Sequence, residues 1–360
     1  MKISLTFFFV VLAYALFKHG IQLPDSVPAG STETMNDHKV RLIHQQEENK
    51  VDVMMGDELF TSYIYPEDME KPVLYPVNAP GNITLTRAFP LEARAGERVD
   101  HPHHVGIWMN YGDVNGLDFW NNSYNIPQEK KEGYGSIRHR EVIQASSGDE
   151  GTLQVKADWL NNANKKLLEE QTTFHFREVE GVRIIDRIVV LKAQKEAVQF
   201  TDNKEGMLAI RVTRALEMPS EKPLKLTNAQ GKPRAEAVLD NTGVNGNYLS
   251  SQAIEGEEVW GTRAKWMKLY GEIENSPVAI AILDHPENPG YPTYWHARPY
   301  GLFAANPLGQ KVFSEGEKEL NLKLNPGEEV IFRYRMLISS DDVLSSEKLN
   351  SLSKDFGQVL

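Results

Sequence analysis

The sequence TTFHFREVEGVRIIDRIVVL, residues 172–191, predicts a β-hairpin. Thr172–Val179 and Val182–Leu191 are rich in β-branched and aromatic residues, which favour strands. Glu180 and Gly181 lie between them as a two-residue turn of the kind that joins antiparallel strands. This segment therefore indicates that the chain builds an antiparallel sheet.

Strand patterns recur along most of the chain. Leucines alternate with polar residues at 320–324, a turn follows at residues 325–327, and apolar residues alternate again over 330–338. Residues 51–54 and 59–65 predict an early hairpin in the same way. Strand patterns do not alternate with helix patterns along the chain, so the sequence gives no sign of a parallel sheet.

Helical periodicity is scarce, and its best example is Asp342–Phe356, with Asp341 or Asp342 as the N-cap. The predicted fold class is therefore all-β: one large antiparallel β-sandwich with long loops that carry the site, followed by a short C-terminal helix. The predicted loops are residues 78–98, 121–138, 227–256 and 284–309.

Composition narrows the class of protein. With 360 residues and 41% hydrophobic residues the chain can bury a large core. Its net charge of -11, without a basic stripe, argues against nucleic acid as a partner. The absence of cysteine excludes disulfides, thiolate catalysis and zinc–thiolate sites.

The N-terminus predicts export. Residues 1–20, MKISLTFFFVVLAYALFKHG, contain an apolar run that is short for a membrane span and suits a signal peptide, with an uncleaved anchor as the alternative. Residues 21–37 are rich in Pro, Ser, Gly and Thr and predict a linker. The sandwich domain should then cover residues 38–341, and the helical tail residues 342–360. We expect a periplasmic or secreted protein without membrane contact beyond the signal segment.

Residues 100–120, DHPHHVGIWMNYGDVNGLDFW, concentrate groups able to do chemistry. In extended geometry His101 and His103 would face one way and His104 the other. A single histidine is usually a packed structural residue, but three in four positions, next to Asp100, indicate a functional site.

Two further segments have a similar make-up. Residues 284–309 combine histidine, carboxylate and aromatic side chains in a frame rich in Pro and Gly. Glu205, in the segment DNKEG, precedes an apolar strand that would bring it to the end of a sheet. Because sandwiches gather loops at one end, we expect residues 100–120, residues 284–306 and Glu205 to line one pocket.

Several of these motifs resemble a known family. LYPVNAPGNITLTRAFP, the histidine stretch, DNKEG, WGTRAKW and DHPENPGYPTYWHARPYGLFAANPLG, within residues 70–338, are similar to the PmoA family, also filed as a domain of unknown function. The resemblance implies a galactose-mutarotase-like sandwich and a link to carbohydrates. The name "methane oxygenase" conflicts with this chain, because no spanning helix follows residue 17.

The leading hypothesis is a sugar-directed hydrolase, lyase or epimerase that uses acid–base chemistry on a sugar or oxidised sugar. His103 or His104 would act as acid, Glu205 as base and Arg298 in substrate orientation, with His296 in support. The residues predicted to bind a small-molecule or oligosaccharide substrate are His101, Trp108, Asp113, Asp118, Trp120, Asp284, His285, Trp295, Tyr300 and Asn306.

Two alternatives stay open at this stage. A divalent metal could be held by a histidine and carboxylate set, with His101, His103, His104 and His285 as candidate ligands, although their spacing alone is a weak signal. A non-catalytic carbohydrate-binding module would explain the tryptophans and the sandwich, but would leave the histidines and Glu205 without a task.

Overall fold

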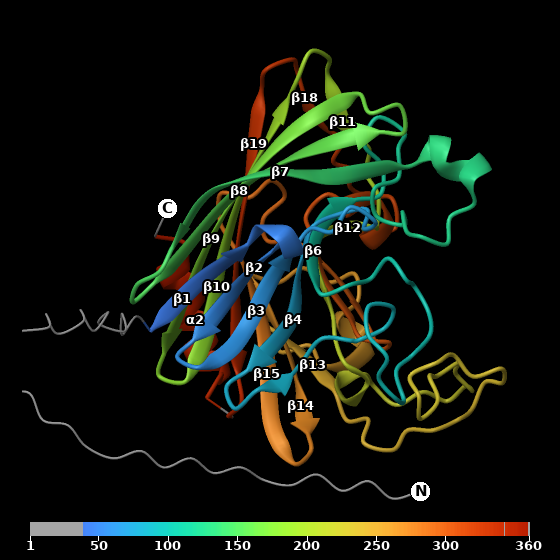
Figure 1. The fold of residues 1–360 in the computed structure, drawn as a ribbon, viewed down its shortest axis with the longest axis vertical. Coiled ribbons are helices and arrows are strands. Elements are labelled where there is room, and N and C mark those ends of the chain that lie inside the picture. Colours follow the sequence, from blue (N-terminus) through green and yellow to red (C-terminus); the bar gives the residue numbers. More distant parts are fainter. Residues whose placement is uncertain (1–38, 342, 359–360) are drawn as a thin grey trace, which may run out of the picture. The chain divides into compact units, whose positions relative to one another are not determined.

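The computed structural model describes residues 39–341 and 343–358, which form two antiparallel sheets packed as a sandwich (Figure 1). The predicted signal peptide and linker lie outside the described residues. The described residues belong to one compact unit. The predicted fold class is confirmed: the described chain is mostly β, with a short C-terminal helix.

The first sheet positions the candidate site. In spatial order it contains β1 (Val40–Gln45), β2 (Lys50–Met55), β3 (Glu58–Ile64), β4 (Val73–Ala79), β6 (Ile107–Tyr111), β12 (Gly206–Arg211), β17 (Leu302–Asn306) and β16 (Tyr294–Arg298), with β5 (Ile83–Thr84) paired to β4. Residues 284–309 therefore include two strands, and the prediction that they form a loop is wrong. Leu302–Asn306 is an unbroken buried run, which marks a strand covered on both faces.

The second sheet forms the other layer. In spatial order it contains β13 (Asn247–Ser250), β14 (Trp266–Ile273), β15 (Ser276–Asp284), β19 (Glu329–Ser339), β10 (Val182–Ala193), β9 (Lys166–Val179), β8 (Gly151–Asn161) and β7 (Gly135–Ser146). A small sheet pairs β11 (Val198–Phe200) with β18 (Leu322–Leu324). The short helices are η1 (Gln46–Glu48), η2 (Gln128–Gly133), η3 (Arg214–Leu216), η4 (Gly256–Val259), α1 (Gln310–Phe313) and α2 (Ser346–Phe356).

The predicted hairpin at residues 172–191 is confirmed as the β9–β10 pair. Val179 lies opposite Val182, and Glu180 and Gly181 between them have φ angles of 52° and 72°. Two consecutive positive φ angles are the signature of a type I′ turn, whose twist matches that of the two strands. The alternate side chains of β9, among them Phe174 and Phe176, pack into the core between the sheets.

The C-terminal helix begins later than predicted. Its N-cap is Ser345, whose Oγ accepts a hydrogen bond from the Lys348 backbone N–H at 3.2 Å. The apolar side chains of α2, among them Leu349 and Phe356, pack in one cluster with Trp266 and Leu283 of the second sheet. The helix therefore covers the face of that sheet that points away from the sandwich core.

The N-cap gives a stability prediction. Because Ser345 Oγ accepts from a first-turn N–H that has no partner within the helix, Ser345→Ala should lower the free energy of unfolding by about 1 kcal/mol. Urea denaturation followed by fluorescence measures this. Ser351→Ala, on the exposed side of α2, is the matched control and should change stability by less than about 0.5 kcal/mol. Equal losses in both variants would contradict the capping role.

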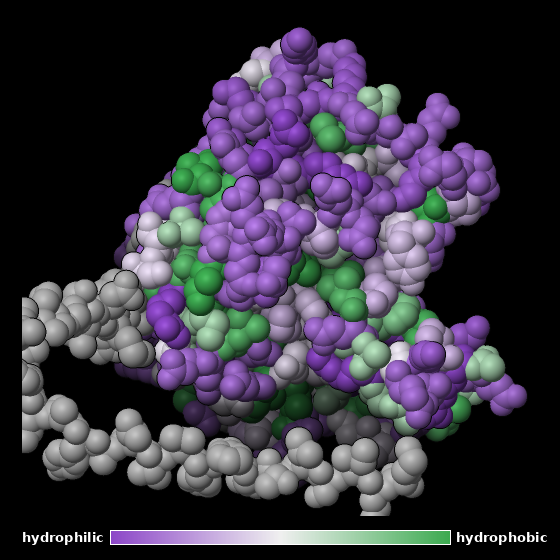
Figure 2. Space-filling view, viewed as in Figure 1, coloured by the Kyte–Doolittle hydropathy of each residue, from purple (hydrophilic) through white to green (hydrophobic). Residues whose placement is uncertain are grey.

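The described surface shows mixed polarity. On the face seen in Figure 2, hydrophilic residues dominate and apolar residues occur in small separate groups, which is ordinary for a folded chain. Among residues 39–341 and 343–358, no helix is long and apolar enough to cross a membrane.

Candidate functional site

The candidate site is built on the outer face of four neighbouring strands, β6, β12, β17 and β16. Trp108, Ala209, Ala304 and His296 lie directly across from one another along these strands. Successive side chains of a strand point to opposite faces, so Ile107 enters the sandwich core while Trp108 lies on the outer face. One sheet face therefore carries residues from both segments that the sequence singled out.

Arg87 holds the histidine segment on this face. Its buried guanidinium donates to the Asp100 carboxylate at 2.7 Å and to the backbone carbonyls of His101 and His104 at 2.8 and 2.9 Å. Burial raises the pKa of Asp100, but Arg211 and Arg87 outweigh this and hold its pKa well below the usual range. A buried ionic network therefore holds residues 100–104 as a shaped loop in front of strand β6.

The three histidine rings pack together. His101, with φ of 40°, stacks on His104 at 4.8 Å and on Tyr300 at 5.0 Å between ring centroids. The ring of His103 lies edge-on to His104 at 4.3 Å. The expectation that His101 and His103 face away from His104 is therefore wrong, because the backbone is not extended here. Tyr300 brings the segment 284–306 into direct contact with the histidines.

The hydrogen bonds of His104 define its role. Arg211 donates to His104 Nδ1 at 3.2 Å, so the neutral ring carries its proton on Nε2. Burial, followed by His103 and Arg211, places the pKa of His104 well below its ordinary value. Burial also lowers the pKa of His103 to about 2. Both rings are neutral at physiological pH, and His104 offers an N–H donor rather than an acidic proton.

The rings are not arranged to hold a metal ion. His101 and His104 are parallel within 5°, so their in-plane nitrogen lone pairs cannot meet at one ion about 2.1 Å from each. His285, the fourth candidate ligand, lies 5.0 Å from the ring of Phe356, on the helix α2. Among the residues that the structure describes, no three His, Asp or Glu side chains form a set that could hold a metal.

Glu205 and His296 form the second half of the site. His296 Nδ1 lies 2.8 Å from the Lys204 carbonyl, which can only accept, so Nδ1 carries the proton and Nε2 the lone pair. Glu205 Oε2 is 3.8 Å from Nδ1. Burial lowers the pKa of His296 to about 4, although Glu205 opposes the shift. The pair therefore consists of a neutral imidazole beside a partly exposed carboxylate, which also contacts the Lys204 ammonium.

The charge of Glu205 reaches residues from other segments. Burial raises the pKa values of Tyr300 and Asp118, and the Glu205 carboxylate adds to both shifts.

Asn306 fixes the loop before β12 by donating to the Asn203 and Lys204 carbonyls at 2.9 and 2.8 Å. Arg298 packs over Trp260 and Tyr300, 5.3 and 5.9 Å from their ring centroids.

Other predicted residues take structural positions. Trp108 and Trp120 are fully buried beneath His104 and support the histidine segment without an exposed ring face. Trp295 points into the sandwich core, where Nε1 donates to the Ala264 carbonyl, because it alternates with His296 along β16. Asp118 accepts two hydrogen bonds from Asn121.

Three more predicted residues are not brought together with the histidine cluster. The Asp113 carboxylate accepts from the Gly116 N–H and caps a turn. Asp284 lies at the end of β15, where it accepts from Asn288 and Thr293, and its burial raises its pKa to about 7. His285 packs on α2. Asp284 and His285 come from the same sequence motif as His296, but the connection from β15 to β16 crosses from the second sheet to the first. The motif therefore contains residues of both layers.

Lys71 is a site residue that sequence reasoning missed. It lies just before β4, with 5% of its surface exposed, and its Nζ donates to the His103 carbonyl at 2.7 Å. The ammonium lies 5.4 Å from the Trp108 ring centroid. Burial lowers the pKa of Lys71 to about 7, although Glu70 and Asp118 oppose the shift. A lone lysine before a proline carries no sequence signal for this, because its burial comes from segments distant in sequence.

Lys71 makes stability depend on pH. The folded chain releases its proton near pH 7 and the unfolded chain near pH 10.4, so between these values the unfolded state binds more protons and stability rises with pH. Lys71→Met removes this cost. Its gain in unfolding free energy over the wild type should be about 2–3 kcal/mol larger at pH 6 than at pH 9. Urea unfolding at both values measures it, and a gain independent of pH would contradict a depressed pKa.

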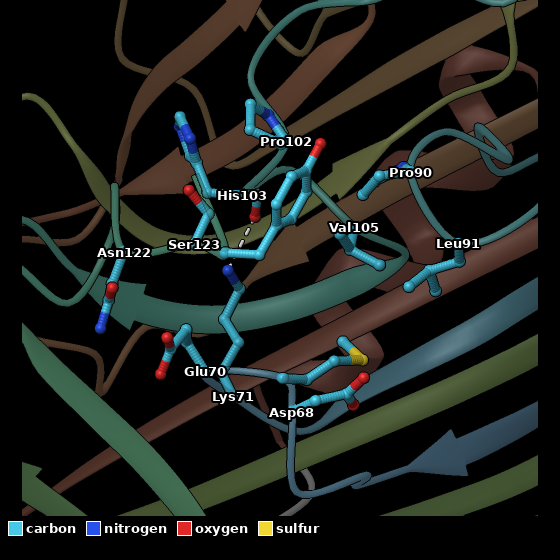
Figure 3. A pocket seen from close by; sticks show the side chains of 12 residues that line it. Asp68, Glu70, Lys71, Pro90, Leu91, Pro102, His103, Val105, Asn122 and Ser123 are labelled. Carbon is cyan, nitrogen blue, oxygen red and sulfur yellow. Dashed lines mark hydrogen bonds between the residues drawn. The ribbon is translucent and has the colours of Figure 1, made fainter. Parts of the chain in front are cut away.

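A small cavity of about 60 Å³ opens beside Lys71. Figure 3 shows the Lys71 side chain reaching toward the His103 backbone, with Asn122 and Ser123 to one side and Val105 and Leu91 to the other. The volume is far below the roughly 300–1,000 Å³ of a pocket for a whole small-molecule ligand. It suits one substituent of a larger molecule.

The chain is distantly similar in structure to sugar-processing proteins. The galactosidase domain of the alpha-galactosidase-sucrose kinase AgaSK matches with a TM-score of 0.39 and 9% identity, over 83% of this chain and 42% of that chain. A galactose mutarotase related enzyme from Lactobacillus acidophilus matches with a TM-score of 0.30 and 12% identity, over 84% and 98%. A galactose mutarotase-like protein from Clostridium acetobutylicum matches with 0.33 and 9%, over 85% and 99%.

The chain thus spans less than half of the AgaSK structure that it matches. No curated protein matches its sequence. A family model matches residues 50–354, nearly the whole of the described sandwich, and the chain therefore belongs to DUF6807, a family of unknown function.

Proposed function

We propose that the protein is an enzyme that acts on a sugar or oxidised sugar by acid–base chemistry, with Glu205 as the base. The observation that carries the proposal is the placement of the Glu205 carboxylate 3.8 Å from His296, on the sheet face that also holds His104. The Glu205 side chain keeps 18% of its surface exposed, so a substrate can reach it. Carboxylates and imidazoles in such a setting exchange protons with hydroxyl groups.

His104 has a different role from the one expected of an acid. Its ring is neutral, and its Nε2–H is buried without a partner among the described residues. A fixed neutral donor of this kind stabilises negative charge that develops on an oxygen, without giving up its proton. We therefore assign proton abstraction to Glu205, charge stabilisation to His104 and support of the Glu205 carboxylate to His296.

Aromatic and cationic side chains at the edge of this face fit a sugar ring. Trp260 keeps 36% of its surface exposed and lies under the Arg298 guanidinium. An exposed indole offers an apolar face to a sugar ring, while a guanidinium donates to its hydroxyl groups. The proposal includes export, which the apolar run of residues 3–17 supports.

Product analysis tests the proposal. Wild-type protein and Glu205→Gln should be incubated with a panel of glycosides, keto-sugar glycosides and uronic acids, and the products separated by mass spectrometry. Turnover by the wild type that is lost in Glu205→Gln supports the assignment. Tight binding measured by calorimetry, with no product after long incubation, would instead favour a carbohydrate-binding module.

A further inference from the structure

Lys71 is a buried cation without an ionic partner. Its ammonium has three N–H donors, and its one hydrogen bond goes to the neutral carbonyl of His103. Within residues 39–341 and 343–358 no acidic side chain forms an ion pair with it. A buried charge of this kind is costly unless it is paired. Its placement therefore indicates a counter-charge that does not come from the described chain.

Two carboxylates near Lys71 are bound elsewhere, and Asp68, which also lines the cavity, is exposed to solvent. Glu70, the neighbouring residue, pairs with Lys131 at 2.6 Å and with Arg138 at 2.8 Å. Both Asp118 oxygens accept hydrogen bonds from Asn121. Neither acid is free to turn toward Lys71 without breaking these contacts. The ammonium is therefore available to an incoming anion.

The buried groups behind Lys71 are also donors. Trp108 Nε1–H and Trp120 Nε1–H have no partner among the described residues, and neither has the His104 Nε2–H. The rings of Trp108 and Trp120 lie 5.2 Å apart, and Lys71 lies over the first of them. Indole nitrogen can only donate. Within the described chain, Asn110 Oδ1 is an unpartnered acceptor on the same sheet face, but the Lys71 ammonium and the three N–H donors outnumber it. This balance favours a ligand with several acceptor oxygens and a negative charge.

The cavity sets the size of that group. Its volume of about 60 Å³ is bounded by apolar side chains and by the polar residues Asp68, Glu70, Lys71, His103, Asn122 and Ser123. A carboxylate of three heavy atoms fits such a space, whereas a complete sugar ring does not. Tyr124 also lines the cavity and keeps 65% of its surface exposed, so the cavity continues to solvent on that side. The remainder of a ligand would extend from there.

We propose that this cavity is the subsite for a carboxylate, held by the Lys71 ammonium, and that the substrate of the proposed enzyme is an acidic sugar. The claim that the substrate is a sugar rests on the proposed function. The claim that the cavity binds a carboxylate rests only on the position of Lys71 and on the cavity.

Calorimetric titration of the full chain tests the subsite with five probes: glucuronate, galacturonate, glucose, galactose and acetate. At pH 6 the uronates should bind about 10- to 100-fold more tightly than the matching neutral sugars, the range expected for a charged hydrogen-bonded contact. Lys71→Met should abolish this preference and leave the neutral sugars unchanged. Lys130→Met, which removes an exposed lysine, is the matched control and should keep the preference.

The pH dependence gives an independent readout. Carboxylates of the probes stay ionised from pH 6 to 8.5, and His103 stays neutral, so Lys71 is the group that titrates in contact with the cavity. Of the acids around it, Glu70 and Asp118 remain engaged by Lys131, Arg138 and Asn121. Asp68, which also lines the cavity, is exposed to solvent. Uronate affinity should fall about 30-fold between pH 6 and pH 8.5 as the ammonium loses its proton.

The outcomes separate the two proposals. Acetate and uronate binding that depends on Lys71 supports the subsite. Acetate binding that depends on Lys71, without binding of any sugar, supports the subsite and counts against a sugar substrate. Equal binding of acidic and neutral sugars, unchanged in Lys71→Met, overturns the subsite and leaves the sugar-directed function standing. Absence of binding by any probe also overturns the subsite.

Discussion

Replacing Glu205 by glutamine is expected to lower the turnover number by about 10²–10⁴-fold, the range that a general base contributes. Glutamine keeps the size of the side chain but cannot take up a proton. The backbone of Glu205 is held by the Gly112 N–H and by Asn203, so the loop should keep its shape. The variant should therefore bind substrate with nearly unchanged affinity while losing catalysis.

Steady-state kinetics and thermal unfolding measure this result together. Glu258→Gln, at an exposed glutamate in η4, is the matched control and should keep full activity. A variant at Glu205 that retains turnover within about threefold of the wild type, with an unchanged melting temperature, would falsify its assignment as the base.

Replacing Arg87 by methionine should lower the free energy of unfolding by about 3–5 kcal/mol, because it leaves the Asp100 carboxylate without one of its buried partners. Four backbone carbonyls, those of Arg98, Asp100, His101 and His104, lose a donor as well. Methionine fills a similar volume, so the loss reflects charge and hydrogen bonding more than packing.

Chemical denaturation measures the loss, and proton NMR of the imidazoles reports whether His101, His103 and His104 keep their stacked arrangement. Arg234→Met, at an exposed arginine, is the control and should stay within about 0.5 kcal/mol of the wild type. Loss of ring stacking with little loss of stability would show that Arg87 arranges the histidine rings but does not stabilise the fold. Unchanged stability together with unchanged ring signals would contradict both roles.

The two proposals complement each other on one sheet face. Glu205 and His296 supply a base at the β12 and β16 side, and Lys71 and His104 supply donors at the β4 and β6 side. An acidic sugar placed between them would put its negative group on donors and its reacting hydrogen near a carboxylate.

The sequence by itself determined the sandwich, because strand alternation and turn chemistry are local properties. The Glu180-Gly181 turn and the alternating run at residues 330–338 needed no tertiary information. Clusters of histidine and aromatic residues also marked the two segments that meet at Tyr300. These signals depend on neighbours within a few residues, which are visible in one sequence.

Only the tertiary structure decided which of those side chains take part. Trp295 enters the core and His296 the site because β16 pairs with β17 and its faces alternate. Asp284 ends a strand of the other sheet and His285 packs against Phe356 of α2, although both lie about a dozen residues before His296 in the chain. Lys71 gains its character from burial under His103 and Trp108, which lie more than 30 residues away in the chain. Burial and charge compensation depend on what surrounds a group in space, so no local pattern could have predicted them.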